Sequence, residues 1–450
     1  MSIQRNLTLV GIATAIQKVV LAGRHLAVVP FYISSWGVQT YGDWLTISAI
    51  PAAMTFANMG IGTAAANAFV IAHASDDLDE AGQCMRDGLT LLSIIVAAGL
   101  VVAIASCIAI FLFAPFLMPP PSIMITAACF TLALDTLIGF YAPLNEAWFR
   151  AARKPHLCTH ITTAFSVVSI ALTILLLKLG AGMLSIASLQ IAITVISTIL
   201  LHLAGRRLSP NVTFRNSHVE LARLRITFLK GMSYMMSPTR QVINIQGTLL
   251  ITRACLGAES AALLGTLRTL ANSIGQVYNA VYATIFPELQ VALASGRHED
   301  ARKLYLFGLG ISSLTAALGC AGLLLLGPWV YHQWTRGLLQ PSNTEWLLLT
   351  LSIFFNAIWW VPAGVFRAAN KPEKIGIVGI GAAVTGVVLS AILMPHTGLS
   401  GAIAGVLLME FFMASYTLPE SCKLIGLPLT KLPLRIWMTF RFLPRNFSIL

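Results

Sequence analysis

The chain has 450 residues, of which 57% are hydrophobic and only 10% are charged, and its formal net charge is +12. Its mean hydropathy is +0.79. Soluble domains contain about 25% charged residues, so this composition excludes a soluble protein. Apolar stretches of about 20 residues, the length that crosses a bilayer as a helix, recur along the whole chain.

The first apolar stretch is expected to be a retained helix and not a cleavable signal, because Gln17, Lys18 and Arg24 lie within it. An all-α integral membrane protein with twelve spans is predicted. The expected spans are 8–33, 42–73, 86–116, 122–149, 156–178, 182–204, 226–252, 258–291, 303–330, 344–366, 373–394 and 399–420.

The loop charges give this chain an orientation. With the N-terminus in the cytoplasm, the loops on the opposite side contain only Lys178, Arg253 and Arg336, and the other loop cations are cytoplasmic. This bias is the positive-inside rule, and it places both termini in the cytoplasm. It also accounts for the positive net charge without a nucleic-acid partner. The basic amphipathic tail 421–450 is expected to lie on the anionic inner leaflet.

An internal repeat divides the chain. Trp148-Phe-Arg-Ala-Ala-Arg-Lys-Pro155 and Val365-Phe-Arg-Ala-Ala-Asn-Lys-Pro372 match at six of eight positions. Two similar basic helix ends would be the alternative explanation, but it leaves the shared Phe, Ala-Ala and Pro unexplained. The repeat predicts two six-helix lobes, 1–205 and 226–420, joined by a cytoplasmic linker 206–225. A pseudo-two-fold axis along the membrane normal would relate them, as in many transporters.

Several basic residues fall inside the expected spans. A cation at the bilayer centre costs roughly 2.5–3.5 kcal/mol, so packing alone would not keep them there. Lys230 is close enough to the cytoplasmic end to extend its amine to water. The other four predict a water-filled cavity that receives an anion, and they are Lys18, Arg24, Arg240 and Arg268.

Polar side chains follow the basic residues at helical spacing. Two stripes repeat every three or four residues, and they contain Ser233, Ser237, Arg240, Asn244 and Thr248 in one span and Arg268, Asn272, Gln276 and Asn279 in the next. Single polar residues in membrane helices often pack helices together. Stripes that include an arginine also need water or a counter-ion. Guanidinium donors suit phosphate, and the neutral side chains suit sugar hydroxyls.

Acids inside the spans are fewer. Asp135, Gly139 and Glu146 are expected on one side of the fourth span. Asp135 would either neutralise one cation in a structural ion pair or, like Glu146, carry a coupling ion. The seven cysteines are scattered and form neither a disulfide framework nor a zinc spacing. No metal and no cofactor is expected.

The second span carries the clearest motif. Tyr41-Gly42-Asp43-Trp44 leads into Phe56-Ala-Asn-Met-Gly-Ile-Gly62. With the six-plus-six plan and the Phe-Arg-Ala-Ala-x-Lys-Pro turns, the chain resembles the bacterial Wzx-type (O-antigen) polysaccharide flippases. These belong to the multidrug/oligosaccharidyl-lipid/polysaccharide (MOP) exporter superfamily. Asn58 stands where that family often has Asp. The resemblance implies a cationic central cavity lined by helices 1, 2, 7 and 8.

The resulting hypothesis is a non-enzymatic transporter of the bacterial inner membrane. It would move undecaprenyl-pyrophosphate-linked oligosaccharide between leaflets for O-antigen, lipopolysaccharide or exopolysaccharide synthesis. Its partners would be this substrate, membrane lipids, a coupling proton or sodium ion, and a polysaccharide polymerase with its chain-length partner. A drug/cation antiporter of the same superfamily is the alternative. A membrane enzyme is disfavoured because the expected external loops are short and no catalytic constellation stands out.

Overall fold

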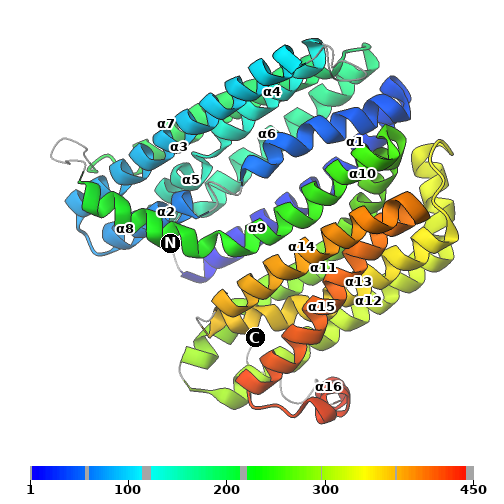
Figure 1. Cartoon of the computed structure of the whole chain (residues 1–450). Coiled ribbons are helices and arrows are strands. Elements are labelled where there is room, and N and C mark those ends of the chain that lie inside the picture. The colour runs from blue at the N-terminus through cyan, green and yellow to red at the C-terminus, as the bar shows by residue number, and fades with distance from the viewer. Residues whose placement is uncertain are drawn as a thin grey trace. The chain divides into compact units, whose positions relative to one another are not determined.

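The computed structural model describes residues 3–55, 60–113, 123–212, 220–294, 296–369 and 372–441. All regular elements in these ranges are helices (Figure 1). Among the described residues, nine helical segments are long and apolar enough to cross a membrane. The motif residue Asn58 and the last part of the tail, 442–450, lie outside the described ranges.

The chain divides into two compact units, Met1–Val242 and Ile243–Leu450. The helices of the first unit are α1 (Ile3–Met54), α2 (Ile61–Ala74), α3 (Leu78–Phe113), α4 (Ile123–Gly139), α5 (Ala142–Ala151), α6 (Pro155–Lys178), α7 (Met183–Leu208), α8 (Leu221–Tyr234) and α9 (Met236–Val242). Helix α1 packs against α6 and α4, and α4 packs against α7. These four helices line the space described in the next subsection.

A hydrophobic core of this unit lies where α2, α3 and α5 meet. The rings of Phe69 and Trp148, both fully buried, contact each other edge to face at 4.8 Å between centroids. Helix α7 approaches the same tryptophan at Gly205, where an added Cβ would stand 2.7 Å from the Trp148 Cβ. Close helix contact at a small residue is the usual packing device in membranes.

Helix α1 contains a sharp break. Gly37 has φ 78° and ψ 169°, a conformation that is essentially restricted to glycine. The expected boundary between the first two spans, at 33–42, is therefore a single-residue kink inside α1. The second expected span, 42–73, is also not one helix, since α1 ends at Met54 and α2 begins at Ile61.

The expected fourth span, 122–149, is likewise interrupted. Helix α4 ends at Gly139, and α5 begins at Ala142 with a proline in its first turn. Proline suits a helix start because its missing N–H would have no helical partner there. Asp135 and Glu146 consequently lie on different helices, and the expectation that they share one helix side was wrong.

The second unit contains a short π-helix, η3 (Ile243–Gly247), followed by a bundle. Its other helices are α10 (Thr248–Leu256), α11 (Ala258–Ala294), α12 (His298–Thr335), α13 (Asn343–Ala368), α14 (Pro372–Thr397), α15 (Leu399–Leu424), the short η4 (Leu429–Lys431) and α16 (Leu432–Arg441). Helix α15 packs on α13 and α14. An added Cβ at Gly405 would stand 2.2 Å from the Gly386 carbonyl oxygen, so α14 and α15 are in backbone contact.

The expected span 226–252 is divided among α8, α9, η3 and α10, and the boundary between the two units falls at its π-helix. Wider π-type winding disturbs the regular backbone hydrogen-bond pattern. Arg268 of α11 donates from Nη1 to the Ile245 carbonyl at 2.6 Å and from Nη2 to the Asn244 carbonyl at 3.2 Å. Arg268 thus supports the irregular backbone of this helix.

The repeat corresponds to matching helix ends. Helix α5 ends at Ala151 and α6 begins at Pro155, whereas α13 ends at Ala368 and α14 begins at Pro372. The separation along the chain is the same in both pairs. The expected count of twelve spans, the lobe boundaries 1–205 and 226–420 and the topology stay predictions.

Candidate functional site

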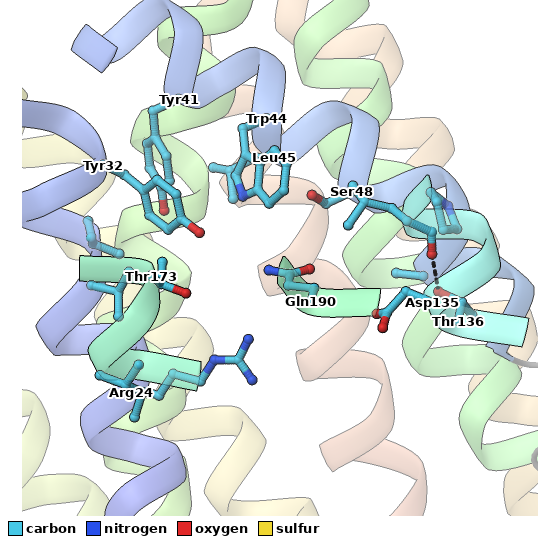
Figure 2. Close-up of a pocket in the computed structure, with 16 residues that line it drawn as sticks. Arg24, Tyr32, Tyr41, Trp44, Leu45, Ser48, Asp135, Thr136, Thr173 and Gln190 are labelled. Atoms are coloured by element: carbon cyan, nitrogen blue, oxygen red, sulfur yellow. Dashed lines mark hydrogen bonds between the residues drawn. The ribbon is translucent and has the colours of Figure 1, made fainter. Parts of the chain in front are cut away.

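Two adjoining hollows lie within the first unit, between α1, α4, α6 and α7. The first has a volume of about 270 Å³ and the second about 220 Å³. Arg24, Asp135 and Gln190 line both of them. Figure 2 shows these three side chains directed toward a common space from α1, α4 and α7. The hollows therefore adjoin at one polar junction, which these three side chains form.

The first hollow has an aromatic wall that comes from both sides of the α1 kink. Tyr32 stacks on Tyr41 with ring centroids 5.6 Å apart and on Trp44 at 6.0 Å. All three are buried, with exposed fractions of 8%, 4% and 5%. Trp36 closes the cluster edge-on to Trp44 at 5.5 Å, and its Nε1 donates to the Ala181 carbonyl at 2.8 Å. The kink at Gly37 brings these rings together.

The second hollow has a wall of hydroxyl groups. They come from α6 and α7, at helical spacing, and are Thr162, Ser166 and Ser169 on α6 and Thr194 and Ser197 on α7. Thr173 continues the α6 stripe into the first hollow. Gln190 continues the α7 stripe into it in the same way. The sequence analysis missed both stripes, although the spacing of three and four residues that identified the others would have found them.

The two charged residues at the junction have opposite signs. Among the ion pairs of the described residues, none joins Arg24 or Asp135 to a partner. The Oδ1 atom of Asp135 is buried and has no hydrogen-bond partner. Buried polar atoms are normally satisfied, so an orphaned carboxylate oxygen beside a hollow indicates a place where a ligand group or water donates.

The structure separates the predicted cations of the first span. Arg24 lies in the wall of both hollows, whereas Lys18 is exposed and lines neither. Directly before Lys18 on the chain, Gln17 donates from Nε2 to the Thr162 hydroxyl at 3.0 Å and joins α1 to α6. Of these residues, Arg24 is the one that lines the two hollows.

The predicted residues of the later spans lie near the π-helix. Arg240 and Asn244 are buried, at 8% and 9% exposure. The Asn244 carbonyl also accepts from the Thr248 hydroxyl at 2.6 Å, in addition to Arg268. These contacts show structural roles for Asn244 and Arg268, and their roles in substrate binding stay predictions.

The neutral members of the α11 stripe differ in exposure. Asn272 is exposed, and Gln276 and Asn279 are half-buried. On the same helix, Tyr278 donates to the Asn356 Oδ1 at 2.5 Å. Asn356 in turn donates to Glu410, which also accepts from the Trp359 indole at 2.6 Å. This buried polar chain joins α11, α13 and α15.

The two acids proposed for ion coupling have different surroundings. The side chain of Glu146 is 55% exposed and lies 3.7 Å from the Arg150 guanidinium in the same helix. Asp135 lies at the junction of the hollows. A carboxylate that is already exposed to solvent and paired with arginine gains little from ligand binding. Asp135 is therefore the better placed of the two.

No protein-family model matches the sequence, and no curated protein matches it. Solved structures do match its fold. One is an inward-facing multidrug resistance MATE family transporter of the MOP superfamily, with TM-score 0.71 and 14% identity over 93% of this chain and 96% of that one. Another is the MATE multidrug transporter DinF-BH, with TM-score 0.68 and 16% identity over 95% of this chain and 98% of that one.

A third is a MOP superfamily transporter from Pyrococcus furiosus, with TM-score 0.64 and 16% identity over 95% of this chain and 96% of that one. It is described as having a binding pocket of reverse polarity that suggests a different function. The chain is thus a multi-pass membrane protein with the fold of MATE transporters of the MOP superfamily. At these identities the likeness concerns the fold alone, and it supports the expected transporter fold.

Proposed function

We propose that this protein moves an undecaprenyl-pyrophosphate-linked oligosaccharide from the inner to the outer leaflet of the bacterial inner membrane by alternating access. The product would serve O-antigen or exopolysaccharide synthesis. The observation that carries the proposal is Arg24, a cation inside the hollow of a membrane-embedded unit, surrounded by aromatic rings, hydroxyls and an amide. Such a wall suits a head group that combines negative charge with hydroxyls.

The cations would replace the water shell of the pyrophosphate. Guanidinium groups offer a fixed fork of donors to phosphate oxygens. In this proposal Lys18, Arg24, Arg240 and Arg268 meet phosphate while the lipid tail stays in the bilayer. The neutral residues that would bind sugar hydroxyls are Asn244, Asn272, Gln276 and Asn279. Outward movement of negative charge is favoured by an inside-negative potential, by about 2.3 kcal/mol per charge per 100 mV.

A coupling proton or sodium ion would bind at Asp135. Its orphaned Oδ1 provides the open position that such an ion needs. Glu146 stays a weaker candidate because it is exposed and lies beside Arg150. Outside the protein, the proposed partners are membrane lipids, a polysaccharide polymerase and its chain-length partner, which would receive the exported unit.

Drug or cation antiport is a second candidate function, and one observation favours it. Asp135 and the rings of Tyr32 and Trp44 line the same hollow, and a carboxylate with aromatic faces attracts an organic cation. Arg24 disfavours this function, because its positive charge lies in the same hollow and would repel a cationic substrate. The two functions therefore predict opposite effects when Arg24 is neutralised.

Proteoliposomes that contain the full-length protein would test the proposal. The assay measures the appearance of undecaprenyl-pyrophosphate-linked oligosaccharide on the far leaflet by lectin access, and uptake of tetraphenylphosphonium in parallel. Arg24→Gln should lower oligosaccharide translocation by about tenfold or more, since hydrogen bonds to charged groups contribute about 1.5–3 kcal/mol. Arg225→Gln, at an exposed position of α8, is the matched control and should leave it unchanged.

The result that would overturn the proposal is also specific. If the wild-type protein fails to translocate the oligosaccharide but takes up tetraphenylphosphonium, and Arg24→Gln increases that uptake, the protein is a cation transporter.

A further inference from the structure

We propose that the first hollow, between the aromatic wall and the Arg24–Asp135–Gln190 junction, is a subsite for one neutral sugar ring of the transported head group. The inference rests on the proposed function and assigns it a position in the molecule. It also reassigns Arg24 from the pyrophosphate to the sugar, so that the pyrophosphate would bind to the other proposed cations along the path.

The charges of the hollow favour a neutral ligand. Arg24 and Asp135 both line it, and their opposite charges make the local sum about zero. A pyrophosphate here would lie beside the Asp135 carboxylate, and an organic cation would lie beside the Arg24 guanidinium. At the low effective dielectric of a protein interior, either like-charge contact is costly. A hydroxyl-rich neutral molecule can instead donate to the acid and accept from the guanidinium.

The aromatic wall provides the other half of sugar recognition. A pyranose ring has a face of C–H bonds that packs on an aromatic ring, and its hydroxyls point outward from the ring edge. Tyr32, Tyr41 and Trp44 form a buried stack whose rings already contact one another. Because the rings are held by packing across the α1 kink, they lose little conformational entropy when a ligand binds.

The hydroxyl wall adjoining this subsite presents acceptors. Thr162 donates to the Cys158 carbonyl at 3.0 Å, and Ser166 donates to the Thr162 carbonyl at 2.9 Å. Ser197 on α7 donates to the Thr194 carbonyl at 3.1 Å. Each hydroxyl has one hydrogen and two lone pairs, so oxygens whose hydrogen is used within the helix still accept. With the orphaned Asp135 Oδ1, this wall suits the O–H donors of a sugar.

The dimensions match one ring. A volume of about 270 Å³ is close to the lower end of the roughly 300–1,000 Å³ range of small-molecule pockets, which suits a single ring. The second hollow, about 220 Å³, shares Arg24, Asp135 and Gln190 with the first. A neighbouring sugar unit would therefore extend toward the α6 and α7 hydroxyls.

Saturation-transfer NMR on the full-length protein in nanodiscs tests this subsite with defined probes. The probes are the methyl glycosides of glucose, galactose, mannose and N-acetylglucosamine. At least one should bind, with saturation concentrated on its ring C–H protons. Tyr32→Leu should weaken that binding by about three- to tenfold, the worth of an aromatic contact. Trp329→Leu, at a ring that is 67% exposed in the other unit, should have no effect.

Charge variants provide a second readout. In the wild-type protein neither inorganic pyrophosphate nor tetraphenylphosphonium should displace the glycoside. Asp135→Asn leaves a net positive hollow, and pyrophosphate should then compete. Arg24→Gln leaves a net negative hollow, and tetraphenylphosphonium should then compete. If Tyr32→Leu does not fold, Gln190→Leu provides the affinity comparison, with the same loss expected.

Three results would overturn the inference. They are binding by none of the four glycosides, binding that the hollow variants leave unchanged, and displacement by tetraphenylphosphonium in the wild-type protein. Its failure can be distinguished from failure of the proposed function. Lipid-linked oligosaccharide translocation with no glycoside binding would refute only the subsite. Glycoside binding without that translocation would refute only the proposed function.

Discussion

Removal of Arg223 gives the sharpest stability prediction, because one side chain joins two helices through two acids. From α8, Arg223 donates from Nη2 to Glu80 at 2.7 Å and from Nε to Asp87 at 3.1 Å, both on α3. The hydrogen bond with Glu80 is the largest cause of the raised pKa of Arg223. Arg223→Ala removes both bonds at once.

The magnitude depends on what Arg223→Ala leaves behind. The side chain of Asp87 is 3% exposed, and without Arg223 it retains a hydrogen bond from Gln83 at 3.2 Å. Loss of one partner of a buried pair costs about 3–5 kcal/mol. Arg223 itself is 32% exposed, so water reaches the site and we expect about 2 kcal/mol. Glu80→Gln should cost less than about 1 kcal/mol, since Glu80 is 42% exposed.

The assay is SDS-titrated unfolding of the purified protein in detergent, which reports a free energy of unfolding. Asp87→Asn in the Arg223→Ala background should restore about 1 kcal/mol or more, because the uncompensated carboxylate is gone. Arg223→Lys should recover only part, since an ammonium lacks the fork that reaches both acids. Equal losses for Arg223→Ala and Glu80→Gln, with no recovery in the double variant, would refute the reasoning.

Two glycine substitutions test the helix geometry by thermal unfolding. Gly37→Ala should destabilise the protein by about 1–3 kcal/mol, because a φ of 78° and a ψ of 169° strain any residue with a side chain. Gly23→Ala is the control and should be neutral, since an added Cβ there has nothing within 4 Å. Equal melting temperatures for the two variants would contradict the kink. Gly405→Ala should lower the stability more than Gly381→Ala does. The added Cβ at position 405 would stand 2.0 Å from the Ser390 Oγ, whereas Gly381 faces open space. A tolerated Gly405→Ala would show that α14 and α15 can separate.

Structural features that depend only on residues adjacent along the chain could be predicted from the sequence. Pro155 and Pro372 begin helices where the repeat indicated, because proline at a first turn is a local property of the chain. The apolar spans were predictable for the same reason, since each one satisfies its backbone hydrogen bonds within itself. The breaks at 139–142 and in η3 were not predicted, and the boundary expected at 33–42 is a kink at Gly37 and not a loop. They depend on how a helix packs on its neighbours.

The candidate site shows the same division. Arg24 and Asp135 were identified because a charge inside an apolar span is costly wherever it points. The α6 and α7 hydroxyls were missed because a Ser or Thr stripe costs little and serves equally well as helix packing. Lys18 and Arg24 looked alike in the sequence. In the structure Lys18 is exposed and Arg24 lines both hollows.

The sequence by itself determined that this chain is a membrane protein and which stretches are apolar enough to span the bilayer. It also determined which residues in those stretches are too polar to be buried in lipid without a partner or water. Tertiary structure decided which of those residues share a space. Arg24, Asp135 and Gln190 are far apart along the chain, on α1, α4 and α7. Helical periodicity sets the direction of each side chain only relative to its own helix. The packing of α1, α4, α6 and α7 decides which directions converge on a hollow.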